Sequence, residues 1–268
     1  MNIKQLFIYP VKSFAAITQS SMAVEPTGLV GDRRFVVVDP EGNFLSQRKF
    51  PKMATIDVEF CGDVIYLSIG DMEISVPSVP TGALVDIKIH SDTCKGIDCG
   101  DEIARRLSEV IGTPCRLVFQ DPTIPRVRHA SAVGSEIEVS FADGYPILLL
   151  GMKSVDDLNQ KLQQGGHPTV LPNVFRPNIL FDGDDTTAFT EDGFGRIQIG
   201  EVILRAVKKC SRCTIVNVDQ RTGVPCVGGW PLKTLAKYRR EDKGVFMGMN
   251  CIVEKSGIIR LSDEIVLL

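Results

Sequence analysis

Residues 202–219 read VILRAVKKCSRCTIVNVD, and both the predicted fold and the predicted chemistry of this chain start from them. Val202 to Lys208 and Thr214 to Asp219 have the composition of short strands. Residues 209–213 are expected to form the turn that joins them. The sequence therefore predicts a β protein in which two thiols and several cations gather where two strands meet.

Similar short runs, separated by turns, occur along most of the chain. The segment Asp39-Pro40-Glu41-Gly42 places Pro and Gly where a type I turn prefers them. Strands at this spacing indicate a barrel or a sandwich, so the predicted class is mainly β (α+β). The remaining predicted strands are Ile3 to Tyr9, Arg34 to Asp39, Ile56 to Phe60, Val64 to Ile69, Met72 to Val76, Leu84 to His90, Tyr145 to Leu150, Asn178 to Phe181, Arg196 to Ile199, Phe246 to Val253 and Ile258 to Leu268.

Three segments have the apolar spacing of a helix. The first runs from Ile103 to Ile111 and is expected to end at the glycine that follows. The second follows Ser154, which can form a capping pair with Asp157, and ends at Gly165-Gly166. The third opens with Pro231, a residue suited to the first turn of a helix.

The region from Gln120 to Ala132 is the predicted boundary between two domains, residues 1–120 and 121–268. Pro122 and Pro125 interrupt any strand ladder there, and Arg126 and its neighbours add positive charge. Two interpretations stay open, a plain linker and a mobile basic lip over a site.

The composition excludes several classes of protein. The 268 residues are 44% hydrophobic and 24% charged, an ordinary globular balance, and the net charge of -3 argues against a broad nucleic-acid surface. Neither a secretion signal nor an apolar stretch of membrane-spanning length is found, so a cytoplasmic protein without membrane contact is expected. The eight cysteines are then expected to be reduced thiols.

The thiol pair at Cys210 and Cys213 is the densest chemical signal. Nearby Lys and Arg favour the thiolate, which is the form that attacks or binds a metal. A structural zinc site would need further ligands, such as Cys226 or Cys251, and a redox dithiol would normally lie in a βαβ unit. Either thiol of the pair could be the metal ligand, with a weak preference for Cys213 because it adjoins the following predicted strand.

Further polar groups stand at other predicted strand ends. Lys12-Ser13 follows the first strand, Asp32-Arg33 follows a glycine-rich turn, and Arg176-Pro177-Asn178 enters a strand. The forked guanidinium of Arg suits phosphate, and the amide of Asn can both donate and accept hydrogen bonds. Together with a thiolate, these groups suit a large anionic cofactor.

The ordered set of these motifs, spread from Met1 to Leu268, resembles the MOSC family. More narrowly, it is similar to the amidoxime-reducing components and their YcbX-type bacterial relatives. The motifs that carry the resemblance are Tyr9-Pro10-Val11-Lys12-Ser13, Gly31-Asp32-Arg33 with Phe35, Asp98-Cys99-Gly100, Phe175-Arg176-Pro177-Asn178-Ile179, Cys210-Ser211-Arg212-Cys213, Val218-Asp219 and Thr222-Gly223.

The resemblance implies two β-barrel-like domains, a MOSC N-terminal β-barrel and a MOSC domain, with a molybdenum cofactor between them. It makes Cys213 the metal ligand and catalytic residue, and it gives no indication of pyridoxal phosphate binding. The cofactor-binding residues that it implies are Lys12, Ser13, Arg33, Arg176, Asn178 and Arg212.

The activity implied by the resemblance is reduction of the N–O bond in small N-hydroxylated compounds. Many bacterial relatives append a ferredoxin-like domain, and the chain as given has no such segment, so a separate flavin or iron-sulfur protein is expected to donate electrons. Gly144-Tyr145-Pro146 departs from the family, which carries small hydroxyl residues before this proline. A non-catalytic carrier of the cofactor or of sulfur is the alternative.

Overall fold

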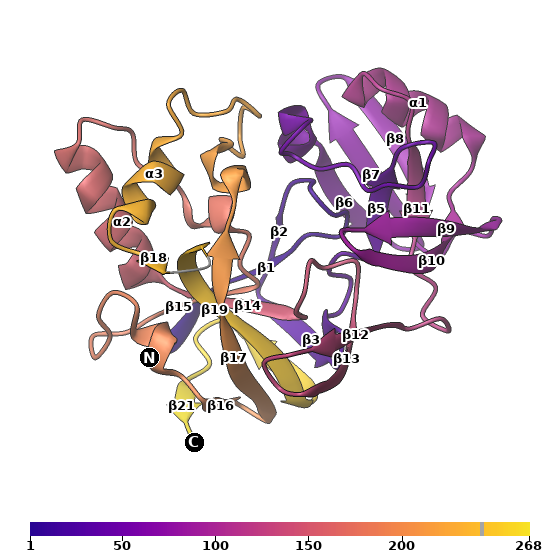
Figure 1. The fold of residues 1–268 in the computed structure, drawn as a ribbon. Coiled ribbons are helices and arrows are strands. Elements are labelled where there is room, and N and C mark those ends of the chain that lie inside the picture. The colour runs from indigo at the N-terminus through magenta and orange to yellow at the C-terminus, as the bar shows by residue number, and fades with distance from the viewer. Residues whose placement is uncertain (242–243) are drawn as a thin grey trace.

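The computed structural model describes residues 1–241 and 244–268, which form two lobes lying side by side (Figure 1). One lobe, in indigo to magenta, is built mostly from the first half of the chain, and the other, in orange and yellow, mostly from the second half. The predicted class, mainly β (α+β) with a few short helices, is confirmed. The α-helices among the described residues are α1 (Asp101–Ile111), α2 (Met152–Gln164) and α3 (Trp230–Ala236).

The largest sheet dominates the second lobe, but it begins with the first residues of the chain. Strand β1 (Asn2–Ile8) pairs antiparallel with β15 (Ile179–Asp182), which runs parallel to β14 (Ile147–Gly151). The strand order is β2-β1-β15-β14-β19-β17-β16-β21, with β18 paired to β19. The other strands are β2 (Ile17–Gln19), β16 (Arg196–Ile199), β17 (Val202–Arg212), β18 (Arg240–Glu241), β19 (Gly244–Lys255) and β21 (Ile265–Leu267).

Smaller sheets build the first lobe and the region around it. The predicted turn after β5 (Phe35–Val38) is confirmed, because Gly42 N donates to Asp39 O at 2.9 Å. Strand β5 joins β11 (Arg116–Phe119), β10 (Asp92–Asp98) and β9 (Leu84–Ile89) in one sheet. Two three-stranded sheets contain β6 (Asp57–Cys61), β7 (Val64–Ile69) and β8 (Met72–Pro77), and β20 (Gly257–Arg260), β3 (Ser21–Glu25) and β4 (Gly28–Leu29).

Each lobe has its own hydrophobic core. In the first lobe Leu107 of α1 packs with Leu67 and Phe35 from two different sheets. In the second lobe Leu149 and Leu204 belong to a core on the large sheet. Each lobe buries its own apolar side chains. The surfaces where the lobes meet can therefore carry polar side chains.

Strand β17 and the residues after it differ from the prediction. The strand continues to Arg212, so Cys210 lies within it and not in a turn. Thr214 to Asp219 is not a strand, because η4 (Thr214–Asn217) is a turn of 3-10 helix. Three β-bulges in the pairing of β17 with β19 let the long strand bend, and the buried Val216 and Val218 fit a 3-10 turn as well as a strand.

The predicted helices are present, with one error at an end. Gly112 ends α1 in the left-handed conformation, with φ of 80°, and Pro231 stands in the first turn of α3. Ser154 does not cap α2, because the helix has already begun at Met152. Its hydroxyl donates instead to the buried carboxylate of Glu191, at 2.8 Å from Oε1. No described helix is long and apolar enough to cross a bilayer.

The region around the predicted boundary is neither a plain linker nor a free lip. Arg126–Ala130 forms β12, which pairs with β13 (Ser135–Val139) as a hairpin. Arg126 is buried, and its Nη1 donates to Ser140 O at 2.9 Å and to Ala142 O at 2.7 Å. The remaining irregular turns of 3-10 helix are η1 (Pro51–Thr55), η2 (Pro172–Phe175) and η3 (Thr190–Gly193).

Candidate functional site

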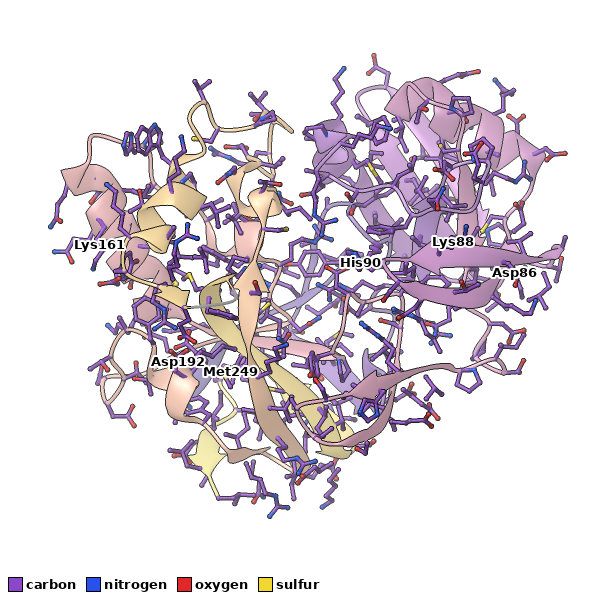
Figure 2. All side chains as sticks on the ribbon, viewed as in Figure 1. Asp86, Lys88, His90, Lys161, Asp192 and Met249 are labelled. Atoms are coloured by element: carbon purple, nitrogen blue, oxygen red, sulfur yellow. The ribbon has the colours of Figure 1, made fainter. Side chains whose placement is uncertain are left out.

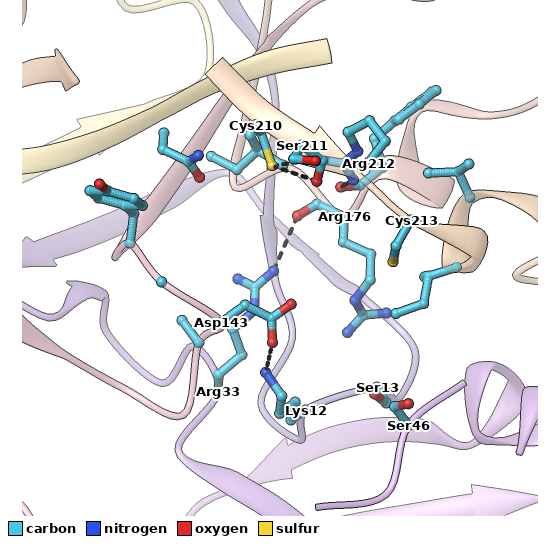
Figure 3. A pocket seen from close by; sticks show the side chains of 18 of the residues that line it. Lys12, Ser13, Arg33, Ser46, Asp143, Arg176, Cys210, Ser211, Arg212 and Cys213 are labelled. Carbon is cyan, nitrogen blue, oxygen red and sulfur yellow. Dashed lines mark hydrogen bonds and ion pairs between the residues drawn. The ribbon is translucent and has the colours of Figure 1, made fainter. Parts of the chain in front are cut away.

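A cleft between the lobes brings together all the residues predicted for the site (Figure 3). The space in and around it amounts to about 810 Å3, which includes open solvent. The predicted residues that line it are Lys12, Ser13, Arg33, Arg176, Asn178, Cys210, Arg212 and Cys213.

The inner end of the cleft is organised around the ring of Tyr9, the residue that follows β1. The guanidinium of Arg33 lies 4.6 Å from the ring centroid, and that of Arg176 lies 4.0 Å from it. The ring is fully buried, and burial, the largest influence on this group, raises the pKa of its hydroxyl. Tyr9 therefore holds two cations close together through cation–π contacts. Below, Tyr9, Arg33, Arg176 and Asn178 are called the floor.

Arg33 is fixed by a carboxylate and by the opposite lobe. Its Nη1 is paired with the buried Asp32, whose other oxygen accepts from Tyr9 N at 2.8 Å. Its Nη2 donates to Arg176 O at 3.1 Å. Burial tends to lower the pKa of Arg33, but the charge of the Asp32 carboxylate and its hydrogen bond favour the charged form, and the pKa is raised. Arg33 therefore stays charged.

Arg176 has no such carboxylate partner among the described residues. Its Nη1 donates to Phe14 O at 2.8 Å, while Nη2 is buried without a hydrogen-bond partner in the described structure. Burial, opposed in part by Tyr9, lowers its pKa to about 10. A buried donor without an acceptor is unfavourable, so this atom calls for an anionic or oxygen-bearing ligand.

Asn178 is 1% exposed, and its amide is used within the protein. Its Oδ1 accepts from Leu148 N at 3.1 Å and from Arg33 Nη1 at 3.3 Å, and its Nδ2 donates to Phe7 O at 3.3 Å. These contacts join strands of both halves and orient Arg33. The arrangement favours a positioning role for Asn178.

Lys12 and Ser13 lie at the start of the first lobe. The Lys12 ammonium is paired with Asp143 and donates to Phe141 O at 2.9 Å, while burial lowers its pKa. His90, which Figure 2 shows facing the second lobe, has its Nε2 3.1 Å from the same Asp143 carboxylate. Lys12 is thus a buried cation that already has a counter-charge.

The backbone is strained at three of these positions. Ser13, Arg33 and Arg176 have φ values of 72°, 51° and 56°, in the left-handed region that side chains other than glycine seldom adopt. The described residues contain three other such non-glycine positions, at His90, Phe189 and Ser262. Backbone strain of this kind gathers at binding sites, where the surrounding structure holds it in place.

The two thiols at the outer part of the cleft have different surroundings. Arg212 Nη1 lies 2.8 Å from the sulfur of Cys210, and its Nη2 donates to Phe175 O. Cys213, directly after β17, has its sulfur 3.5 Å from Nε of Arg48, which comes from the first lobe. Figure 3 shows the sulfur of Cys213 directed into the cleft, well apart from that of Cys210. Below, Arg48 and Cys213 are called the rim.

Sequence reasoning missed several residues of the cleft. Arg48 and Asp143 follow no motif that the sequence analysis singled out, and Ser46 and Asn250 also line the cleft. Gln220 follows the quoted Val218-Asp219 motif, and its Oε1 lies 3.5 Å from Arg176 Nη1. Tyr145, at the point where the sequence departs from the family, lines the cleft as well. These residues lie beside the motif residues only in the folded structure.

The residues of the cleft fit a large anionic group. Within the described chain, Nη2 of Arg176 and Nε of Arg212 are buried donors that lack acceptors, and both side chains line the cleft beside two thiols. Guanidinium groups are well suited to phosphate, and a thiolate is a ligand for soft metals. No three His, Cys, Asp or Glu side chains are grouped as a metal site anywhere in the described residues, the cleft included.

Comparison with known proteins gives matches along most of the chain. Residues 1–114 match the MOSC N-terminal beta barrel domain, and residues 136–266 match the MOSC domain. Mitochondrial amidoxime-reducing component 1 of Homo sapiens is 32% identical over 100% of this chain and 83% of its own length, and that of Mus musculus is 31% identical over 100% and 82%. Molybdenum cofactor sulfurase of Danio rerio is 29% identical over 89% of this chain, but over 30% of its own length.

Proposed function

Because the chain belongs to the MOSC-domain family that contains the amidoxime-reducing components, we propose that it is a molybdenum-dependent reductase of N-hydroxylated compounds. The observation that supports this most directly is the pairing, in one cleft, of a thiol with buried arginine donors that lack acceptors. Such donors need an anion, and a phosphate-bearing molybdenum cofactor supplies one.

The floor would hold the cofactor. Arg33 and Arg176, both against the ring of Tyr9, would present positive charge to the phosphate, and Asn178 keeps Arg33 in place. Arg212, Lys12 and Ser13 extend the same polar wall. Arg33, Arg176, Arg212 and Lys12 each donate to a backbone carbonyl, so these cations need little reorganisation when the cofactor binds.

The sulfur of Cys213 would ligate the metal. It faces the cleft, 3.5 Å from Nε of Arg48. The sulfur of Cys210 is instead in contact with the guanidinium of Arg212, which also bonds to the backbone. When bound, the molybdenum centre supplies two-electron redox chemistry at an oxygen atom.

The reaction is balanced by protons and external electrons. An N-hydroxylated substrate, two electrons and two protons yield the N–H compound and water, with cleavage of the N–O bond. We expect a separate flavin or iron-sulfur protein to supply the electrons. The protein contributes binding, orientation and positive charge around the reacting oxygen.

A second candidate is a carrier that holds the cofactor, or a sulfur atom on Cys213, without reducing a substrate. Its support is the similarity to a molybdenum cofactor sulfurase. Turnover of an amidoxime with an artificial electron donor separates the two functions, because a carrier gives none.

The decisive experiment is metal and pterin analysis of protein from a molybdate-supplied, cofactor-competent host. The proposal requires near-stoichiometric molybdenum and pterin, followed by N–O reduction with an artificial donor. Zinc without pterin would overturn it. Loaded protein without turnover would favour the carrier.

Two further expectations from the sequence belong with this proposal. Division of the chain at residue 120 remains a proposal, and β1, from the first part, completes the sheet of the second. The cytoplasmic location also remains a prediction, since the relatives named above as reducing components are called mitochondrial.

A further inference from the structure

The five cations of the cleft differ in their existing partners and in their exposure. Lys12 and Arg33 are paired with the carboxylates of Asp143 and Asp32. Arg176 and Arg212 are largely enclosed and donate to backbone carbonyls. Arg48 alone among them is classed as exposed, and within the described residues it takes part in no ion pair. It is therefore the cation of the cleft that remains accessible to a second ligand.

The segment that carries Arg48 is held firmly. Gln47, the preceding residue, is fully buried, and its Nε2 donates to Ser13 O at 2.9 Å. Its amide also pairs in both directions with that of Gln220 across the lobes, at 3.1 and 3.0 Å. The backbone at Arg48 is therefore already anchored, and only its side chain has to become ordered when it binds a ligand.

The Arg48 side chain lies against the sulfur of Cys213. Nε lies 3.5 Å from that sulfur, and the two terminal nitrogens of the planar guanidinium make no hydrogen bond to any described residue. Because the guanidinium is rigid, these donors lie within a few ångströms of the sulfur. An atom reacting beside Cys213 is thus within their reach.

We propose that Arg48 is the substrate-recognition residue of the cleft, and that it binds the oxygen of the N–O group beside Cys213. The identity of the substrate rests on the proposed function. The attraction of anions to Arg48 does not depend on it. A fork of two donors matches an oxygen that gains negative charge as the N–O bond breaks.

The first test uses the cofactor-free protein. Cys213 is alkylated with anionic iodoacetate and with neutral iodoacetamide, each of which transfers its carbon to the sulfur with loss of iodide. Because both reagents need the same thiolate, the ratio of their rates does not depend on the thiolate fraction. Trypsin cleaves after Arg212 and Arg221, which isolates Cys213 from the other cysteines for mass spectrometry.

Arg48→Gln should lower the iodoacetate-to-iodoacetamide ratio at Cys213 roughly fivefold, because an accessible cation a few ångströms away is lost. Arg48→Lys should keep most of the ratio, since it retains the charge. Lys49→Gln is the matched control, because Lys49 is an exposed neighbour whose Nζ lies over Phe50, 5.3 Å from the ring centroid. An unchanged ratio in Arg48→Gln would overturn the inference.

The second test uses the cofactor-loaded protein. Arg48→Gln should lower kcat/KM for an amidoxime roughly fivefold with molybdenum and pterin content unchanged, and Arg48→Lys should also lower it, because the fork is lost. An unchanged kcat/KM would refute recognition of the substrate oxygen. If the wild type reduces no N-hydroxylated compound, the proposed function fails, whereas the alkylation ratio still decides whether Arg48 attracts anions.

Discussion

The floor and the rim of the cleft use arginine in different ways. On the floor, Arg33 and Arg176 are enclosed, lie against Tyr9 and are tied to backbone carbonyls. On the rim, Arg48 is exposed and touches only the sulfur of Cys213 among the described side chains. The same side chain thus serves permanent binding where it is buried and transient recognition where it is accessible.

Substitutions on the floor and on the rim should therefore have different effects on cofactor retention and on turnover. Loss of a floor residue should release the cofactor, because the donors for its phosphate are lost. Loss of a rim residue should spare the cofactor and reduce turnover. Cys213→Ala tests the rim and Arg176→Met tests the floor. Ser13→Ala and Lys209→Gln then set limits on the division, at a further residue of the cleft and at a cation outside it. They follow from the largest expected effect to the smallest.

Cys213→Ala should leave a folded, pterin-containing protein whose N–O reduction is more than ~100-fold slower, because the metal loses its protein ligand. Turnover and pterin content are measured on the same sample. Cys210→Ala is the matched control and should retain most of the activity. Near-normal turnover of fully loaded Cys213→Ala, or a larger loss in Cys210→Ala, would assign the ligand to the other thiol.

Arg176→Met should weaken cofactor retention by about 10- to 100-fold, which is the worth of one or two charge-assisted hydrogen bonds. Retention is measured as pterin remaining after gel filtration and dialysis. Arg196→Met removes the same charge from an exposed position paired with Glu254 and serves as control. If both variants retain the pterin equally, the floor does not bind the cofactor.

Ser13→Ala should weaken retention by only ~3- to 10-fold, because one neutral hydrogen bond is removed. The hydroxyl of Ser13 donates to no described residue, and its side chain lines the cleft, so it is available for the cofactor. The same pterin assay applies. A loss as large as that of Arg176→Met would show that the strained backbone at this position, and not the hydroxyl, matters.

Lys209→Gln should change turnover less than twofold. Lys209 belongs to the cationic cluster of the sequence, but its Nζ lies 2.7 Å from Glu241 Oε1 and 3.5 Å from Asp192 Oδ2, outside the cleft. Loss of these pairs should lower the free energy of unfolding by ~0.5 kcal/mol. Urea denaturation measures the stability, and a clear fall in turnover would place Lys209 in the site after all.

The strands and helices were largely predictable because their signals are local. Alternating β-branched residues, a Pro-Gly turn at Asp39–Gly42 and an amphipathic run ending at Gly112 each act over a few residues. The errors occurred where local patterns were ambiguous. Val216 and Val218 are buried two residues apart, which a strand and a 3-10 turn satisfy equally well.

The sequence by itself determined the chemical inventory of the site, namely two thiols near cations and three polar motifs, and their order carried the resemblance to the family. Tertiary structure decided which of these groups lie together and what each touches. It brought Arg48 to Cys213 across 165 positions of sequence and stacked Arg176 on Tyr9. Such contacts depend on how two separately packed lobes meet, and no local pattern encodes that geometry.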